Sequence, residues 1–434
     1  MQSPDRPYAG YLEQVVERIA RAERPPATSP FDGATQLHDR LGETVEALGA
    51  ALLDLSHDIH AHPELGFNEH HAAATVASVL GDHGIDAQVG AWDLDTAVHA
   101  RIGDGEPTVA LIAEYDALPQ IGHGCGHNVI CATAVGAFLA LHELGDDLEG
   151  SVELIGTPAE EGGGGKELIA RAGGFDDIDA VLMVHPFGMD VAAHPWLGVR
   201  QVQVTFHGTA AHASFMPFLG RNALDAVVQT YNSVSQLRQH MLPSDRIHGI
   251  ITEGGHAPNI VPDRASAHFY VRSAEPETLV TLTERMSAII DAAALATGTT
   301  ADVTWDVCPP YLPVRSNRPL AAQYAMNVSD RGRQVLPEGI APSEFAGSTD
   351  LGNVSVRVPS IHPLLGIAPA EVIIHSADFA DWAVSERADA ATLDGAIGLA
   401  RTAADYLGDA DLRAAVGKDF DAEGGVLDVL GLLS

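Results

Sequence analysis

Short apolar runs alternate with helical segments along the first half of the chain. Residues 109–113, 151–155 and 180–184 are apolar runs of strand length, and residues 129–144 and 167–172 between them have helical character. Strands separated by helices are typical of a mostly parallel sheet with helices on both faces. The pattern therefore predicts an α/β fold, in which ligands bind outside the carboxyl ends of the strands.

Two helices are expected before this sheet. Apolar residues recur at helical spacing in residues 41–60 and again in residues 69–82. Residues 21–34 are rich in proline and arginine, so we predict a loop there. We interpret residues 1–45 as a peripheral N-terminal arm.

The pattern changes between residues 198 and 312, where half-buried strands and two long helices follow one another. The expected order is strand 199–206, helix 221–240, strands 247–252 and 265–272, helix 276–293 and strand 301–307. This βαββαβ order is typical of a compact split-βαβ unit. We therefore predict an inserted α+β domain within the α/β domain.

The chain after the insertion is expected to complete the first domain. Residues 320–331 and 386–404 have helical patterns, and a polar turn at 347–350 precedes the apolar segment 354–358. Residues 408–434 are acidic and interrupted by glycine, so we expect them to pack loosely. The predicted organisation is an arm (1–45), an α/β domain in two parts (46–197 and 313–434) and an inserted domain (198–312).

Several residues that commonly bind metal ions follow the apolar runs. They are Cys125 and His127 in a glycine-rich loop, the pair Glu160 and Glu161, and the histidines His185 and His375. Each has a simpler explanation when taken alone. Any one of the 21 histidines is more commonly a surface or a satisfied buried residue, Cys125 is explained as a small buried thiol, and adjacent glutamates often begin a solvated helix. The four sites together, each at the end of a strand, favour a metal centre.

Thiolate, imidazole and carboxylate ligands are typical of zinc, and a mixed site also accepts manganese, cobalt or nickel. Two such ions about 3.5 to 4 Å apart would activate a water molecule for hydrolysis. A carboxylate beside the ligands is suited to act as a general base. His123 in the same loop is interpreted as a loop residue.

The order of short motifs along the chain resembles the M20 metallopeptidases. The motifs are HPELGF (62–67), YDALP (115–119), CGHN (125–128), TPAEEG (157–162), HAS (212–214) and IHS (374–376). Asn128 and the segment 347–355 resemble the subgroup that contains aminobenzoyl-glutamate hydrolases and β-alanyl dipeptidases. The resemblance extends over residues 50–405.

The resemblance implies a role for each residue of the site. Cys125, His127, Glu161, His185 and His375 would bind two divalent ions, with one ligand shared, and Glu160 would be the general base. Asp116 would orient a ligand, with a simple turn residue as the alternative. His212 would reach the scissile carbonyl group of a neighbouring subunit. Asn259, Ser348 and Thr349 would bind substrate, although ordinary turns explain them as well, and Arg221 and Arg272 are candidate carboxylate clamps or structural ion pairs.

The composition narrows the class of partner. The chain has 59 acidic and 24 basic residues and a formal net charge of −35, which disfavours nucleic acid, anionic membranes and polyanionic substrates. The acidic residues are scattered, so we hypothesise adaptation to high salt, and a melting temperature that does not respond to salt would contradict this. We find no apolar run of about 18 residues and no signal-like N-terminus, and the three cysteines do not form a disulfide framework. A cytoplasmic protein is expected.

These observations predict a metal-dependent amidohydrolase that acts on an N-acyl amino acid or a dipeptide. A dipeptidase or aminopeptidase of the same family is the nearest alternative, and a catalytically silent binding subunit is another, which Glu160 argues against because a binding protein needs no base. A redox pair of Cys125 and Cys131 is disfavoured by their spacing. The resemblance also implies a homodimer, with the inserted domain acting as a lid and contributing a dimer contact.

Overall fold

The computed structural model describes residues 8–336, 339–340 and 345–433, so residues 1–7 of the expected N-terminal arm lie outside the described residues. The chain divides into two compact units. Unit 1 consists of residues 1–194, 315–346 and 353–427, and unit 2 consists of residues 195–314, 347–352 and 428–434.

Unit 1 contains a six-stranded sheet of order β1-β2-β4-β3-β5-β11. Its strands are β1 (Gln88–Val89), β2 (Val98–Gly103), β3 (Thr108–Glu114), β4 (Ser151–Thr157), β5 (Ala180–Leu182) and β11 (Ser360–Ile361). Strands β4, β3, β5 and β11 run parallel, whereas β2 pairs antiparallel with both β1 and β4. Every residue of β3 and β4 is buried, so both faces of the sheet centre are covered. The predicted mostly parallel α/β sheet is confirmed.

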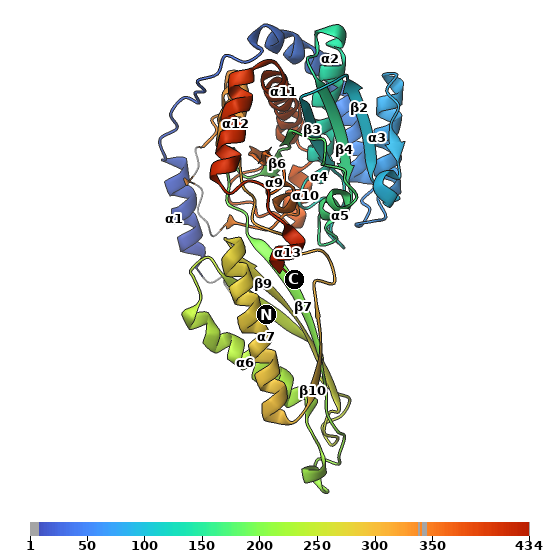
Figure 1. The fold of residues 1–434 in the computed structure, drawn as a ribbon, viewed down its shortest axis with the longest axis vertical. Helices are drawn as coiled ribbons and strands as arrows, with labels where there is room; N and C mark the ends of the chain where they lie inside the picture. The colour runs from blue at the N-terminus through green and yellow to red at the C-terminus, as the bar shows by residue number, and fades with distance from the viewer. Residues whose placement is uncertain (1–7, 337–338, 341–344, 434) are drawn as a thin grey trace. The chain divides into compact units, whose positions relative to one another are not determined.

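Unit 1 contains the helices α1 (Ala9–Ala20), α2 (Thr35–Ala61), α3 (His70–Asp82), α4 (His127–His142), α5 (Gly165–Arg171), α8 (Arg318–Asn327), α10 (Ala377–Trp382), α11 (Glu386–Gly408) and α12 (Ala410–Ala422). Several of these helices, α4 and α11 among them, pack against the six-stranded sheet, whereas α1 lies apart from it (Figure 1). Helix α4 contacts β3, α2 and α11, and its side chains are buried from His127 to Leu141. It is therefore the central helix of the core. A short parallel pair, β6 (His185–Phe187) with β12 (Leu364–Gly366), completes the unit.

Unit 2 has the predicted βαββαβ order. It contains β7 (Gly198–His207), α6 (Ala223–Leu237), β8 (Arg246–Glu253), β9 (Arg264–Ser273), α7 (Pro276–Thr297) and β10 (Thr300–Trp305). The antiparallel sheet has the order β10-β7-β9-β8, and the alternating burial along β9 shows that one face is covered. Helices α6 and α7 contact each other and the sheet (Figure 1). The short helix α9 (Leu351–Ser355) crosses a unit boundary, and α13 (Val429–Leu433) belongs to unit 2.

The C-terminal segment differs from expectation. We expected loose packing after residue 408, but Ala410–Ala422 forms α12, which packs on α8 and α11. Asp409 caps the helix by accepting hydrogen bonds from Asp411 N and Leu412 N, and Leu412 and Val416, four residues apart, are fully buried. The buried pair and the contacts of Asn317 with Val416 O and of Arg318 with Asp419 hold this helix in place, so composition alone was a poor guide.

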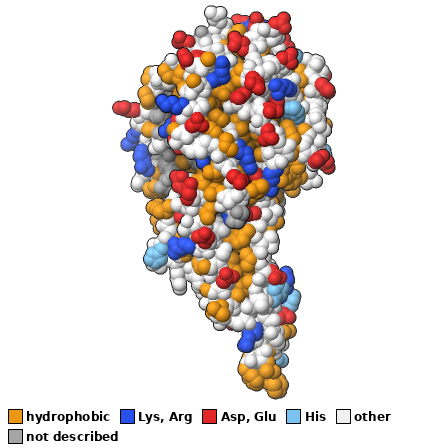
Figure 2. Space-filling model, in the orientation of Figure 1, with side chains coloured by type: hydrophobic (Ala, Val, Ile, Leu, Met, Phe, Trp, Pro, Cys, Tyr) orange, Lys and Arg blue, Asp and Glu red, His pale blue; other side chains and the backbone are white. Residues whose placement is uncertain are grey.

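Acidic side chains are spread over the face of the molecule shown in Figure 2 and do not gather in one block. This agrees with the scattered acidic residues of the sequence. Among the described residues, none of the helices combines the length and the apolar character needed to cross a bilayer.

Candidate metal centre

The loop after β3 leads directly into α4 and carries the first two candidate ligands. Gly126 has φ 78°, a left-handed conformation that glycine adopts readily, and a Cβ atom there would lie 3.0 Å from Pro186. This tight turn places Cys125 just before the helix and His127 at its first residue. Cys125 is 6% exposed and His127 is fully buried, so both face the interior.

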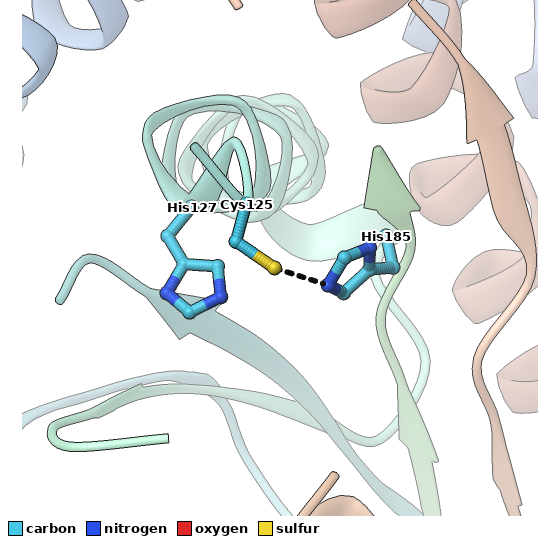
Figure 3. Close-up of side chains that lie close together, drawn as sticks. All are labelled: Cys125, His127 and His185. Atoms are coloured by element: carbon cyan, nitrogen blue, oxygen red, sulfur yellow. Dashed lines mark hydrogen bonds between the residues drawn. The ribbon is translucent and has the colours of Figure 1, made fainter. Parts of the chain in front are cut away.

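Cys125 belongs to two separate groups of candidate ligands. One group is Cys125, His127 and His185, and the other is Cys125, Glu161 and His375, with ligand atoms within 4.8 Å of one another in each. In the first group, Cys125 Sγ lies 3.4 Å from His185 Nε2 (Figure 3). In the second, His375 Nε2 lies 3.3 Å from Glu161 Oε1. A residue common to both groups is in the position of a bridging ligand for two ions.

The elements explain this convergence. The parallel strands β3, β4 and β5 end at Glu114, Thr157 and Leu182. The candidate ligands Cys125 and Glu161 lie in the loops after β3 and β4, and His185 begins β6 shortly after β5. Carboxyl ends of parallel strands meet at the same edge of a sheet, where ligands of α/β proteins bind. His375 joins them through its backbone, because its N–H donates to Gly124 O at 2.8 Å.

Asp116 connects two of the candidate ligands. Its Oδ1 lies 2.9 Å from His127 Nδ1, and its Oδ2 accepts a hydrogen bond from Glu161 N at 2.9 Å. Burial alone would raise the pKa of Asp116, but the His127 charge and hydrogen bond lower it overall, so the carboxylate is ionised. Asp116 therefore accepts the Nδ1 proton of His127 in a hydrogen bond and fixes the ring with Nε2 toward Glu160, an orientation that carboxylates commonly give to metal-binding histidines.

Glu160 lies beside the ligands and is 6% exposed. Its Oε2 is 3.8 Å from His127 Nε2, and His127, Glu160 and Glu161 form a third group of candidate ligands. Ala159, directly before it, has φ 55°, a left-handed conformation that is uncommon outside glycine. The turn thus directs two adjacent carboxylates toward the same centre.

The donor atoms fit divalent metal ions. Among the described residues, His127 Nε2 and Glu161 Oε1 are buried without a hydrogen-bond partner, as expected for atoms that bind an ion. Burial and the nearby Glu161 raise the pKa of the Cys125 thiol, so a thiolate there requires a cation beside it. Burial also lowers the pKa of His185 to about 4, which keeps its imidazole neutral and able to coordinate.

Sequence reasoning missed a buried ion pair at this centre. Lys166 Nζ lies 2.5 Å from Glu114 Oε1, both side chains are fully buried, and Glu114 Oε2 is 3.5 Å from His127 Nε2. The signal in the sequence was that only Lys166 and Lys418 are lysines, and that Lys166 follows four glycines in a row. A rare lysine directly after a run of glycines indicates a residue with a specific structural role.

Other polar residues near the ligands are structural. His123 is buried, its Nε2 contacts Ile59 O at 3.0 Å, and burial lowers its pKa to about 3. Asn128 donates hydrogen bonds to Ser56 Oγ and Ala383 O. Cys131 is buried within α4, and all three cysteines are free thiols.

The remaining predicted site residues lie in unit 2 and form two local pairs. His212 forms an isolated β-bridge with Ile260, so it lies beside exposed Asn259, whose backbone oxygen accepts a hydrogen bond from Ala213 N at 2.9 Å. Arg272 Nη1 donates to Ser348 Oγ at 2.7 Å.

Thr349 is buried, and its Oγ1 accepts a hydrogen bond from Leu351 N. Thr349 thus has a local capping contact within unit 2, and its hydroxyl group can still donate a hydrogen bond.

Comparisons with known proteins show the family of the chain. The family model described as "Peptidase family M20/M25/M40" matches residues 110–389. A Mus musculus protein named Xaa-Arg dipeptidase is 36% identical over 423 residues, covering 94% of this chain and 96% of that protein. A p-aminobenzoyl-glutamate hydrolase polypeptide of Escherichia coli (strain K12) is 34% identical over 305 residues, covering 65% of this chain and 63% of that protein. The crystal structure of a putative aminohydrolase from methicillin-resistant Staphylococcus aureus has the same fold, with a TM-score of 0.69 at 20% identity over 85% of this chain and 100% of that one.

The fold and these relatives define a metal-dependent hydrolase that acts on amide or peptide bonds. The chain belongs to peptidase family M20/M25/M40, which confirms the resemblance found in its motifs.

Proposed function

We propose that this enzyme hydrolyses the amide bond between an acyl or aminoacyl group and an amino acid at a centre of two divalent ions. Cys125, His127 and His185 would hold one ion, and Cys125, Glu161 and His375 the other. The observation that carries the proposal is the position of Cys125 in both ligand groups, with Glu160 beside them. Zinc suits this mixture of sulfur, nitrogen and oxygen donors, and manganese, cobalt or nickel could replace it.

When bound, the two ions would lower the pKa of a water molecule and polarise the substrate carbonyl group. Glu160 would accept a proton from the attacking water and deliver it to the leaving nitrogen. Asp116 supports this step by fixing the His127 ring and the Glu161 backbone. His212 would donate a hydrogen bond to the carbonyl oxygen in the site of a partner subunit.

The substrate carboxylate would bind in unit 2. The described contacts of the Arg272 guanidinium are Ser348 Oγ, His248 Nε2 and the ring of Tyr270, and none of these is a carboxylate. A largely enclosed guanidinium without a carboxylate partner is suited to bind one from a ligand. Ser348 and Thr349 would add hydroxyl and backbone donors, and Asn259 an amide.

The substitution Glu160→Gln tests the general base. It keeps the size of the side chain and its hydrogen bonds but removes the base, so we expect kcat to fall by roughly 10²- to 10⁴-fold while the metal content stays that of the wild type. Measurement of kcat, together with the metal content from elemental analysis, decides whether Glu160 acts as the base. Wild-type kcat in this variant would exclude Glu160 as the base.

A dipeptidase for basic C-terminal residues is the second candidate function. The Mus musculus relative is named Xaa-Arg dipeptidase, and the net charge of −35 favours a cationic over an anionic substrate. A panel of Xaa-Arg and β-alanyl-Lys dipeptides, N-acetyl amino acids and p-aminobenzoyl-glutamate separates the two. Preference for the basic dipeptides supports the dipeptidase, and preference for the acylated or glutamate substrates supports the amidohydrolase.

We also propose a cytoplasmic homodimer. Three free thiols without a disulfide suit a reducing compartment. In unit 2, Ile250 is 63% exposed on the edge strand β8, and Phe215 and Phe218 are 67% and 77% exposed. An apolar sheet edge and exposed aromatic residues favour association with a second copy. Sedimentation analysis tests this, and a monomer at micromolar concentration would contradict it.

A further inference from the structure

We propose a second kind of metal site, formed by Asp58, His62 and His71 on the surface of unit 1. One ligand atom from each residue lies within 4.8 Å of the others, and none of them belongs to the Cys125 centre. His71 Nε2 lies 2.6 Å from Asp58 Oδ2, and His62 Nδ1 lies 3.3 Å from Asp58 Oδ1. The centroids of the two imidazole rings are 4.3 Å apart.

The backbone places these three side chains together without help from an ion. Asp58 lies in the last turn of α2, and His62 follows four residues later as its C-terminal cap. Glu64 fixes the start of α3, because its carboxylate accepts hydrogen bonds from His71 N at 2.9 Å and from Ala72 N at 3.0 Å. The site is therefore preorganised, so little conformational freedom is lost when an ion binds.

Both the backbone and the side chain of Asp58 contact His62. The His62 Nδ1 atom lies 2.9 Å from Asp58 O, a contact that fixes the orientation of the ring. The short contact between His71 Nε2 and Asp58 Oδ2 joins an imidazole to a carboxylate, and a cation between them would replace the shared proton.

Two imidazoles and one carboxylate select a transition ion such as zinc, nickel or copper, since calcium and magnesium prefer oxygen ligands. The side chains of Asp58, His62 and His71 are 36%, 55% and 42% exposed, so water would complete the coordination. An exposed site with water ligands exchanges its ion with solution. We therefore expect the site to bind its ion reversibly, with an occupancy that follows the free metal concentration.

An ion at this site would join the end of α2 to the start of α3. It would thereby hold together the two ends of the segment between these helices. That segment contacts the loops of the catalytic centre, because Glu64 O accepts a hydrogen bond from Ala117 N at 2.8 Å and Glu69 Oε1 accepts one from Ala159 N at 2.8 Å. Binding of the ion to the folded state alone raises the melting temperature. The site is thus a metal-dependent clamp on a segment that supports the centre.

The test is a titration of the purified, metal-loaded enzyme with additional zinc chloride. It is followed by calorimetry, by metal analysis after gel filtration in buffer that contains the same free zinc concentration, and by the melting temperature. Wild type is expected to take up one more ion per chain and to melt at a higher temperature. The variant His71→Gln is expected to lose both effects and to keep wild-type activity without added zinc. His57→Gln, on the same helix, pairs with Asp389 outside the site and should behave as wild type.

A second variant, His62→Gln, is expected to lose the additional ion as His71→Gln does. If the wild type takes up no additional ion, or if both variants take up as much zinc as the wild type, the three residues form only a solvated hydrogen-bond cluster and the proposal is wrong. The Cys125 centre is unchanged in all these proteins, so the outcome is independent of the proposed reaction.

Discussion

Glu69 accepts a hydrogen bond from the backbone N–H of Ala159 at 2.8 Å, across 90 residues of sequence. Glu69 is fully buried and also accepts a hydrogen bond from Thr96 Oγ1 at 2.7 Å. Ala159 holds φ 55° directly before Glu160. A Cβ atom built on Gly66 would lie 2.8 Å from the Cβ atom of Ala159, so only glycine fits at position 66. Glu69 therefore holds the turn that orients the proposed general base.

The substitution Glu69→Ala tests this support. It leaves Ala159 N and Thr96 Oγ1 buried without their acceptor, which costs about 1 to 3 kcal/mol for each group. We expect a lower melting temperature and a loss of kcat of about tenfold or more, because small displacements of a catalytic group are costly. Glu69→Gln keeps an acceptor oxygen and is the matched control. Equal kcat in Glu69→Ala and wild type would show that the turn holds its shape without Glu69.

Asp116 is expected to act through His127 and Glu161. Asp116→Asn keeps the shape but removes the charge that holds the proton on His127 Nδ1. Loss of such a partner commonly lowers metal affinity by about 10- to 100-fold. Competition with a chromophoric chelator measures the affinity. Wild-type affinity would favour the alternative that Asp116 is a turn residue.

Cys125 is expected to react with a thiol reagent only after the ions are removed. Cys308 is partly exposed and reacts in either state, so the variant Cys308→Ser provides a clean background. Cys131 is fully buried in α4 and is an internal control that stays unreactive while the protein is folded. In this variant we expect no titratable thiol in the metal-loaded enzyme and one per chain with chelator. Reaction at Cys125 before chelation would contradict its role as a ligand.

Glu153 on β4 should make stability depend on pH. Burial alone would raise its pKa, but His99 Nε2 at 2.9 Å and Arg101 Nη1 at 2.6 Å lower it below the ordinary value of 4.5. A depressed carboxyl pKa gives stability that is complete above the unfolded value and is lost as pH falls through the folded value. Glu153→Gln should therefore be less stable than wild type at pH 7, with the difference narrowing below about pH 4.5. Urea unfolding at several pH values measures this, and a constant difference would contradict the role of the charge.

Local patterns were sufficient to predict most of the fold. The apolar runs of β3, β4 and β5 and the βαββαβ order of unit 2 follow from residue periodicity, which depends only on neighbours in sequence. Strand β2 was missed. It pairs antiparallel with β4 and with the two-residue edge strand β1. Its polar residues His99 and Arg101 contact Glu153, and its short alternation gave a weak signal.

The ligands on the first three stretches could be predicted because these stretches follow the parallel strands β3, β4 and β5, which bring their ends together. The expectation that His375 also ends a strand was wrong, since residues 372–374 form a loop. The residues that support the ligands could not be predicted. Glu69, Glu114 and Lys166 act through contacts with segments distant in sequence, and a carboxylate or an amine there has no local signature. Only the packing of α3 and α5 against the sheet shows that the three side chains are buried, Glu69 with hydrogen bonds and Glu114 and Lys166 as an ion pair.

Metal content is the most direct test of the central claim. Elemental analysis of the wild type and of His71→Gln, purified without added metal, should give about two divalent ions per chain at the centre. Hydrolysis of N-acyl amino acids or dipeptides should disappear with chelator and return with zinc or a similar ion. Absence of metal, with no hydrolysis after zinc, manganese, cobalt or nickel is added, would contradict the binuclear mechanism.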